Sequence, residues 1–152
     1  MAISYRLQLA TDTTPETVVV AAAAGAGIGP VTPEQTTVRL FKASGEGLWL
    51  YGSANDAMSQ MISREDYGVD ATVSLVMRLD KFDLPGAQRR MLLAVSGALS
   101  GCAGDVVLLF NGERPVLRRR DGEVVFDTDF GVWTPDLLAV SDLPYRLGSM
   151  YL

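Results

Sequence analysis

The sequence predicts an α+β fold in which two helices pack on one face of a largely antiparallel sheet, as a single domain over residues 1–152. Three observations predict this fold. Short runs that alternate apolar and polar residues indicate half-buried strands. Turn-forming residue pairs join several of these runs as hairpins. Finally, two segments carry clear helix signals.

The first third of the chain predicts a strand, a helix and two further strands. Residues 3–9 place an apolar side chain at every second position, which is typical of a half-buried strand. Pro15 suits the first turn of a short helix predicted over residues 15–24. Extended runs at residues 36–41 and 48–51 are separated by turn residues, so they are expected to pair as a hairpin.

The middle of the chain predicts a loop, a strand and the clearest helix. Residues 53–68 are polar with only a weak helical pattern, so a loop with at most one helical turn is expected. Residues 71–79 alternate as a half-buried strand. Asp83 is positioned to cap a helix that begins near Pro85, where apolar residues recur at helical spacing.

The last third of the chain predicts an antiparallel meander. Its three strands are expected at residues 106–110, 116–120 and 124–126, joined by Asn111-Gly112 and Asp121-Gly122 turns. The residues from Asp127 onward are expected to be irregular.

Composition excludes several kinds of chemistry. The chain has 13 Lys plus Arg, 18 Asp plus Glu, one Cys and no His. Without His, neither a Ser-His or Cys-His nucleophilic site nor a His-ligated metal site can form. Cys102 cannot form an internal disulfide and is expected in the core. Any catalysis must therefore rest on carboxylates, Lys, Tyr or Ser, and no catalytic residue, cofactor or metal ion is assigned.

The formal net charge of −5 argues against binding to nucleic acid or to an anionic membrane through bulk electrostatics. An acidic surface favours a basic protein partner instead. Residues 18–28 form the most apolar stretch, but they are too few to span a membrane, and acidic residues precede them where a secretory signal is basic. A cytoplasmic location is expected, and the oligomeric state stays open.

A Gly-rich stretch at residues 25–30 has some features of a dinucleotide-binding fingerprint. Pro30 occupies the position of the third Gly, and no helix signal follows directly. A helix C-terminus followed by a loop is the favoured interpretation.

Four carboxylates fall within nine positions of one another: Asp121, Glu123, Asp127 and Asp129. Because strand residues alternate, these side chains are candidates for an acidic ridge that binds a basic partner. A solvated acidic turn is the favoured interpretation, and the ridge is the alternative. Metal binding is disfavoured because the remaining ligands of a calcium loop are missing.

Aromatic residues are expected to supply much of the core volume, namely Trp49, Tyr51, Phe110, Phe126 and Trp133. Trp133 lies in a loop-like stretch, so it is also a candidate for partner binding, although core packing is favoured.

The run Arg118-Arg119-Arg120 lies in a predicted strand. Alternation places Arg118 and Arg120 on one face and Arg119 on the other. Ion pairs with neighbouring acidic residues are expected, rather than a groove for nucleic acid.

The chain contains, in order, the stretches M-A-I-S-Y-R-L-Q-L-A-T-D, V-M-R-L-D-K-F-D, M-L-L-A-V-S-G-A-L-S-G, G-D-V-V-L-L-F and L-R-R-R-D-G-E-V-V-F. In these stretches the sequence resembles the third type of Sit immunity-protein family, from contact-transferred bacterial toxin systems. The resemblance implies a non-enzymatic cytoplasmic protein that neutralises a cognate toxin, encoded by an adjacent gene, through direct binding. Residues 20–36 are shorter than the family pattern and rich in Ala and Gly, which puts a partner surface there in doubt.

Two other classes of function stay open at this point. A small-molecule or cation-binding domain with carboxylate-based hydrolytic activity would need an apolar pocket with two converging carboxylates. An assembly subunit, which the Met and Leu content favours only faintly, would show a mass that depends on concentration.

Overall fold

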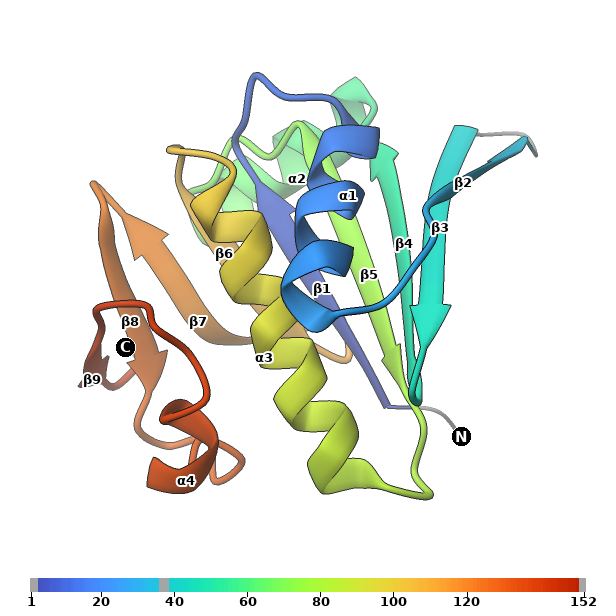
Figure 1. Ribbon diagram of the computed structural model, residues 1–152. Coiled ribbons are helices and arrows are strands. Elements are labelled where there is room, and N and C mark those ends of the chain that lie inside the picture. Colours follow the sequence, from blue (N-terminus) through green and yellow to red (C-terminus); the bar gives the residue numbers. More distant parts are fainter. Residues whose placement is uncertain (1–2, 36–38, 151–152) are drawn as a thin grey trace.

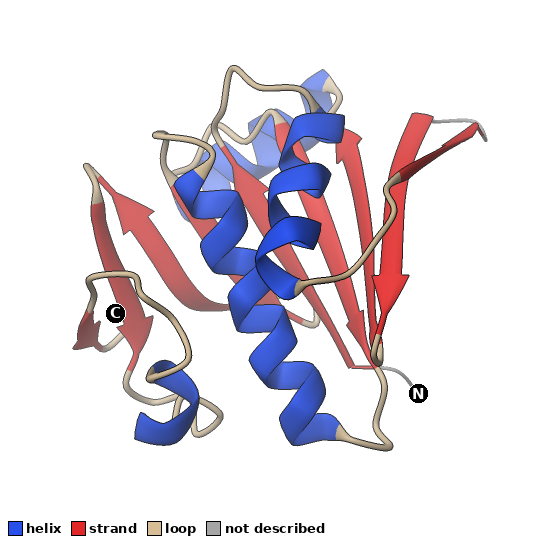
Figure 2. Ribbon diagram, in the orientation of Figure 1, coloured by secondary structure: helices blue, strands red, loops and turns tan. Residues whose placement is uncertain are grey.

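The computed structural model describes residues 3–35 and 39–150 (Figure 1). The strands are β1 (Ile3–Leu9), β2 (Thr32–Gln35), β3 (Arg39–Gly45), β4 (Leu48–Ala54), β5 (Val73–Leu79), β6 (Val106–Phe110), β7 (Arg114–Arg120), β8 (Glu123–Asp127) and β9 (Arg146–Gly148). The helices are α1 (Pro15–Ala26), α2 (Ala57–Tyr67), α3 (Leu84–Ser100) and α4 (Pro135–Leu138). The strands described form one sheet in the order β2-β3-β4-β5-β1-β6-β7-β8-β9 (Figure 2).

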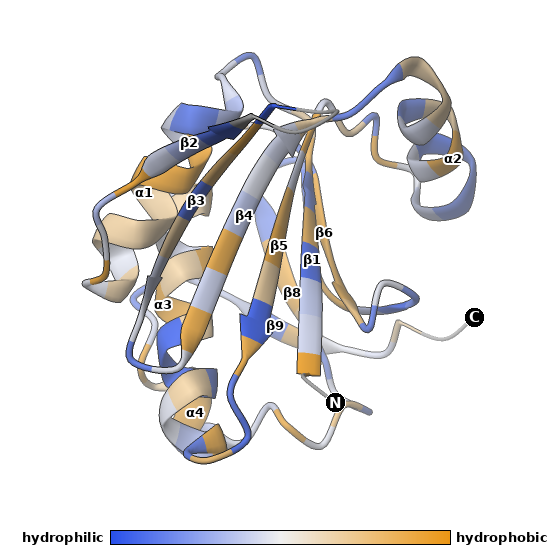
Figure 3. Cartoon of the chain, turned by 90° about the vertical axis from the view of Figure 1, so that its right-hand side faces the viewer, coloured by the Kyte–Doolittle hydropathy of each residue, from blue (hydrophilic) through white to orange (hydrophobic). Residues whose placement is uncertain are grey.

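The predicted α+β class is confirmed. Neighbouring strands run antiparallel throughout this order, apart from β8 and β9, which are parallel. The helices α1 and α3 lie side by side on one face of the sheet, as two helices were expected to do (Figure 1). A view from the β2 edge shows α4 on the same side as α3 and α2 on the opposite side (Figure 3).

The expected loop at residues 53–68 is wrong, because α2 occupies most of it. Asp56 caps this helix by accepting a hydrogen bond from the Ser59 N–H at 2.8 Å, and this bond lowers the pKa of the Asp56 carboxyl. Gly68 ends the helix in the left-handed conformation, with φ 72°. The buried residue of α2 is Ser63, and the apolar residues of the helix face away from the core, so its helical spacing does not coincide with a buried face.

Two other strand predictions need correction. Of the extended run expected at residues 36–41, residues 36–38 lie outside the described residues, and β3 continues the run to Gly45. The segment after Asp127 is not entirely irregular, because α4 reverses the chain and β9 then pairs parallel to β8. A parallel pair needs such a crossover connection, which local sequence patterns do not reveal.

Predicted turns are confirmed at both Gly pairs of the meander. Asn111 and Gly112 have φ of 53° and 76°, and Asp121 and Gly122 have φ of 52° and 82°. Residues of this type tolerate the left-handed conformation that tight hairpin turns require. The hairpin of β3 and β4 is also confirmed, and it turns at residues 46–47.

The main core lies between the sheet and the pair α1 and α3, and these helices approach closely at two glycines. A Cβ on Gly25 would lie 2.5 Å from the Leu93 carbonyl oxygen, and a Cβ on Gly97 would overlap the Ala21 carbonyl. Gly27 ends α1 with φ 70°. The Gly-rich stretch therefore packs one helix and ends it, as the favoured interpretation predicted.

Candidate functional site

Asp121 and Glu123 lie at the tip of the β7–β8 hairpin, where both side chains are exposed. The backbone N–H of Asp121 donates to Asp105 Oδ1 at 3.2 Å. Glu123 Oε1 accepts a hydrogen bond from Arg146 Nε at 2.7 Å, so its charge is partly neutralised. Their role in partner binding stays a prediction.

Asp127 and Asp129 lie at the other end of β8, so Glu123 and Asp127 are separated by roughly 13 Å of strand. The Asp127 side chain is fully buried and accepts from Arg114 Nη2 at 3.3 Å and from the Asp129 N–H at 3.0 Å. Asp129 is exposed and accepts from Ser149 Oγ at 2.8 Å. One continuous acidic ridge is therefore a wrong prediction, since Asp127 anchors the chain inside the protein.

Trp133 is buried, with 8% of its surface exposed. Its Nε1 donates to the Val116 carbonyl at 2.7 Å, and its ring lies 5.0 Å from Phe126 and 5.6 Å from Phe130, centroid to centroid. The core-packing alternative for Trp133 is confirmed, and its side chain offers little surface to a partner.

The arginine run divides between the two faces of β7, as alternation predicted. Arg119 is buried and donates to the backbone carbonyls of residues 99, 102 and 104, at the C-terminal end of α3. Arg120 is exposed and donates to the Tyr67 carbonyl at 3.4 Å. The expected ion pairs are absent, since none of the three arginines has a carboxylate within 4.0 Å among the described residues. The positive charge of Arg119 stabilises the helix terminus instead.

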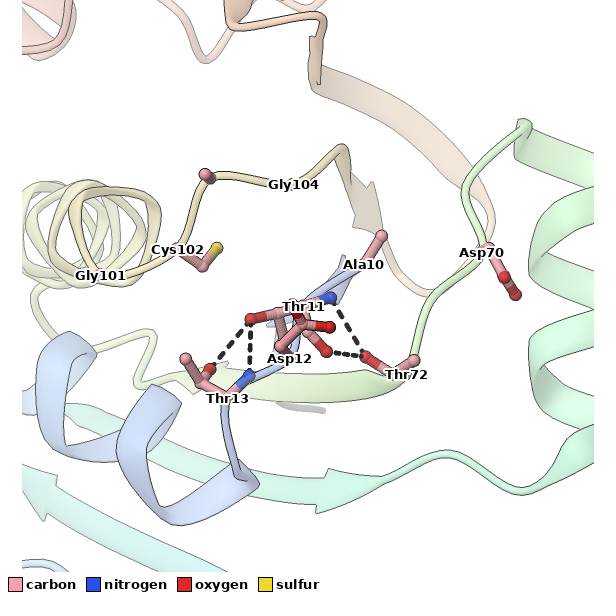
Figure 4. Close-up of a pocket in the computed structure, with 10 residues that line it drawn as sticks. Ala10, Thr11, Asp12, Thr13, Asp70, Thr72, Gly101, Cys102 and Gly104 are labelled. Carbon is pink, nitrogen blue, oxygen red and sulfur yellow. Dashed lines mark hydrogen bonds between the residues drawn. The ribbon is translucent and has the colours of Figure 1, made fainter.

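A hollow of about 490 Å³ lies where β1 leads into α1 (Figure 4). Thr72 Oγ1 donates to the Thr11 carbonyl at 2.7 Å and accepts from the Thr11 N–H at 3.1 Å. Thr11 Oγ1 in turn accepts from the Thr13 N–H at 3.1 Å. These hydroxyl groups hold the loop backbone. Cys102, which was expected in the core, is half-buried beside them.

Two carboxylates border the same hollow, Asp12 and Asp70. The Asp70 carboxylate accepts from Arg64 Nη2 at 3.0 Å, and Figure 4 shows it directed away from the threonines. The pair does not converge on one point, so this hollow lacks the arrangement that carboxylate-based hydrolysis requires. Across residues 3–35 and 39–150, no group of three or more His, Cys, Asp or Glu side chains is placed to hold a metal ion.

A different surface emerges on the side of the sheet opposite α1 and α3. It is made by outward residues of β3, β4, β5 and β1, and we call it the open sheet face: Lys42, Trp49, Tyr51, Val76, Arg78 and Arg6. Strand pairing places Trp49 directly opposite Arg78, and Tyr51 opposite both Val76 and Lys42. Arg6 lies opposite Val76 on the next strand. These residues therefore form one continuous surface.

The aromatic residues of the open sheet face correct an expectation from the sequence. Trp49 is 39% exposed and Tyr51 is half-buried, whereas Leu48 and Leu50 are fully buried. Because strand side chains alternate, burial of the two leucines against α1 and α3 turns both aromatic rings to the other face. The alternating pattern L-W-L-Y in the sequence was the signal that could have indicated the outward direction of both aromatic residues.

The two arginines of the open sheet face lack ion-pair partners among the described residues, whereas Lys42 Nζ lies 3.5 Å from Glu34 Oε2. At the border of this face, the Tyr67 hydroxyl donates to the Glu113 carbonyl at 3.3 Å. Burial, then the charges of Asp66 and Glu113, raise the pKa of Tyr67, and the positive charge of Arg6 opposes this.

Helix α2 adds an apolar stripe on the same side of the sheet (Figure 3). Met58, Met61 and Ile62 are 67%, 44% and 47% exposed, and their spacing puts them on one side of the helix. We call these three residues the α2 stripe. Next to α2, Asn55 Nδ2 donates to Gln8 Oε1 at 3.0 Å and to the Ala71 carbonyl, so the start of the helix is fastened to β1. The stripe is thus held in place and exposed, as in many interaction sites.

A family model described as SitI3-like matches residues 3–137. The chain belongs to the SitI3-like family. Membership confirms the resemblance found in the sequence and suggests an immunity protein with a non-catalytic role. No curated protein and no solved structure matches the chain.

The matched range contains every residue of the open sheet face and the whole α2 stripe of this SitI3-like chain, and it ends before β9. Helices in the described ranges are too short or too polar to cross a membrane. The sequence identified Arg6 and Arg78 only as outward residues of two strands. That they share a surface with Trp49 depends on the strand order β4-β5-β1.

Proposed function

We propose that this SitI3-like chain is an immunity protein that neutralises a cognate bacterial toxin by direct protein–protein binding. The observation that carries the proposal is the family match over residues 3–137. The toxin would reach the cytoplasm from a neighbouring cell, so we propose that the immunity protein acts there.

Inhibition by occlusion fits the distribution of side chains. A tight protein complex needs exposed aromatic, Arg and apolar residues that can be buried together. The open sheet face and the α2 stripe supply all three types on one side of the molecule. The hollow of Figure 4 is less suited to chemistry, because its threonine hydroxyls bind the loop backbone.

A second candidate surface for toxin binding, which we call the rival surface, consists of the exposed carboxylates Asp121, Glu123 and Asp129. They would steer a toxin of opposite charge, as the acidic net charge of the chain favours. Their separation along β8 makes them two small patches rather than one.

Co-expression with the product of the adjacent gene tests the proposed function. We expect that gene product to arrest or kill the host alone, and host survival with a co-purifying complex when both proteins are present. An unrelated acidic protein of similar size, expressed at the same level, should give neither rescue nor complex. Toxicity without rescue or complex would refute immunity by direct binding.

A further inference from the structure

The open sheet face carries positively charged side chains, although the net charge of the chain is negative. The whole chain carries a formal charge of −5, yet this face presents Arg6, Arg78 and Lys42, with Glu34 on the adjacent strand as the partner of Lys42. Asp66 and Glu113 lie at its border, near Tyr67, and neither is ion-paired with Arg6 among the described residues. At its centre the face therefore carries two positive charges, those of Arg6 and Arg78, that have no ion-pair partner among the described residues of this acidic protein.

Arg6 and Arg78 are diagonal neighbours on adjacent antiparallel strands, because Arg6 pairs with Val76 and Ser4 pairs with Arg78. Diagonal residues lie about 7–8 Å apart, within reach of long side chains. Like charges on neighbouring exposed positions repel each other, and a carboxylate bound by both guanidinium groups would relieve that repulsion. Guanidinium groups also bind carboxylates through two parallel hydrogen bonds.

The neighbours of the two arginines are suited to a protein rather than to a free anion. Trp49 is directly opposite Arg78 and is 39% exposed, and Tyr51 continues the same strand. Trp, Tyr and Arg are the residue types that carry most of the binding energy in protein interfaces. The α2 stripe adds apolar surface on the same side (Figure 3). A protein partner can cover this apolar surface, whereas the phosphate backbone of a nucleic acid would leave it exposed to water.

We infer that the open sheet face, flanked by the α2 stripe, binds the toxin, and that the toxin presents an acidic surface to Arg6 and Arg78. This inference rests on the proposed function and names the partner's chemistry. A second copy of the chain does not fit face to face, since the two arginine pairs would repel each other. Nucleic acid is disfavoured by the overall negative charge.

The test measures association of the purified chain with the product of the adjacent gene. The variant carries Arg6→Glu and Arg78→Glu, and a control with the same change of charge carries Lys81→Glu and Arg89→Glu, two exposed residues beyond the end of β5 and on α3. We expect the association rate constant to fall at least tenfold in the first variant and less than threefold in the control. The rate for the unaltered chain should also fall with added salt.

Two further variants keep the result interpretable. Met61→Lys, on the α2 stripe, should increase the dissociation rate at least fivefold, and Asp121→Lys with Glu123→Lys should leave association within threefold of the unaltered chain. Circular dichroism should show each variant folded, as expected for exposed positions. Arg6→Gln with Arg78→Gln replaces the first variant if charge reversal disturbs folding, with a smaller decrease expected.

Each remaining outcome overturns a defined statement. Unaltered binding by the Arg6 and Arg78 variant would overturn this inference alone, and loss of binding in the Asp121 and Glu123 variant would assign the contact to the rival surface. Failure of the unaltered chain to bind or rescue would overturn the proposed function together with the inference. Binding of single-stranded RNA that needs Arg6 and Arg78, with toxin binding unaffected, would assign the face to nucleic acid.

Discussion

Arg119 and Leu99 are joined by a hydrogen bond of 2.8 Å from the guanidinium Nη1 to the backbone carbonyl near the end of α3. The same guanidinium donates to the carbonyls of Cys102 and Gly104, each at 2.7 Å from Nη2. The last carbonyls of a helix have no partner within the helix. A side chain of β7 therefore completes α3 and fastens the helix to the sheet.

We expect Arg119→Ala to lower the free energy of unfolding by about 3 kcal/mol, since it removes the hydrogen bonds that this buried side chain donates to the carbonyls of residues 99, 102 and 104. Chemical denaturation followed by circular dichroism measures the change. Arg118→Ala, on the other face of the same strand, should change it by about 0.5 kcal/mol or less. Equal effects of the two substitutions would contradict the assigned role of Arg119.

Asp127→Asn should also destabilise the fold, by about 2–4 kcal/mol, because Arg114 loses a buried charged partner. The matched change Asp129→Asn removes a carboxylate that is exposed and should have a small effect. Urea denaturation of the two variants in parallel gives the comparison. A stable Asp127→Asn variant would mean that this carboxylate is not structural.

Gly97→Ala should lower the free energy of unfolding by about 1–3 kcal/mol, since a methyl group at this position meets the Ala21 carbonyl of α1. Gly131→Ala is the matched control, because nothing lies within 4 Å of the added carbon. Thermal unfolding of both variants, compared with that of the unaltered chain, measures the difference in stability. If both melt at the temperature of the unaltered chain, the two helices are not in close contact at this point.

Tyr5 makes stability depend on pH in the alkaline range. Burial raises the pKa of Tyr5 to about 12 from the ordinary 10.0, and its hydroxyl has no hydrogen-bond partner among the described residues. A raised pKa in the folded state gives stability that is present below pH 10 and lost as pH rises toward 12, by about 2–3 kcal/mol in total.

The variant Tyr5→Phe should not show this part of the alkaline loss, and near pH 7 it should be as stable as the unaltered chain. Denaturation midpoints measured from pH 7 to pH 12 for the two proteins isolate the effect from other titrating groups. Parallel curves across that range would show that Tyr5 ionises with its ordinary pKa.

Unfolding should occur in one cooperative transition, as the sequence predicts for a single domain. The main core cluster joins residues of β1, α1, the central strands, α3 and α4. Tryptophan fluorescence and far-ultraviolet circular dichroism should therefore give the same midpoint. Two separated transitions would divide the chain into independent units.

The sequence alone predicted a helix where apolar residues recur at helical spacing and a capping residue precedes them. Helix α3 was predicted from Asp83 and from apolar residues at helical spacing, and Asp83 does accept from the Gly86 N–H at 3.2 Å. Helix α2 has the capping residues Asp56 and Gly68 but no buried apolar face, and the caps alone did not lead to its prediction. Strand β9 was missed because its pairing with β8 depends on a reversal of the chain at α4.

In the candidate site, too, some features follow from the local sequence and others only from the tertiary structure. Alternation by itself determined that Arg6 and Arg78 face away from Tyr5 and Met77, and that Arg119 faces away from Arg118 and Arg120. Only the tertiary structure decided which outward faces stay open and which are covered, as Asp127 is by the residues that follow it. The reason is that side-chain direction is a local property of a strand, whereas burial and neighbours depend on strand order and on helices distant in the chain.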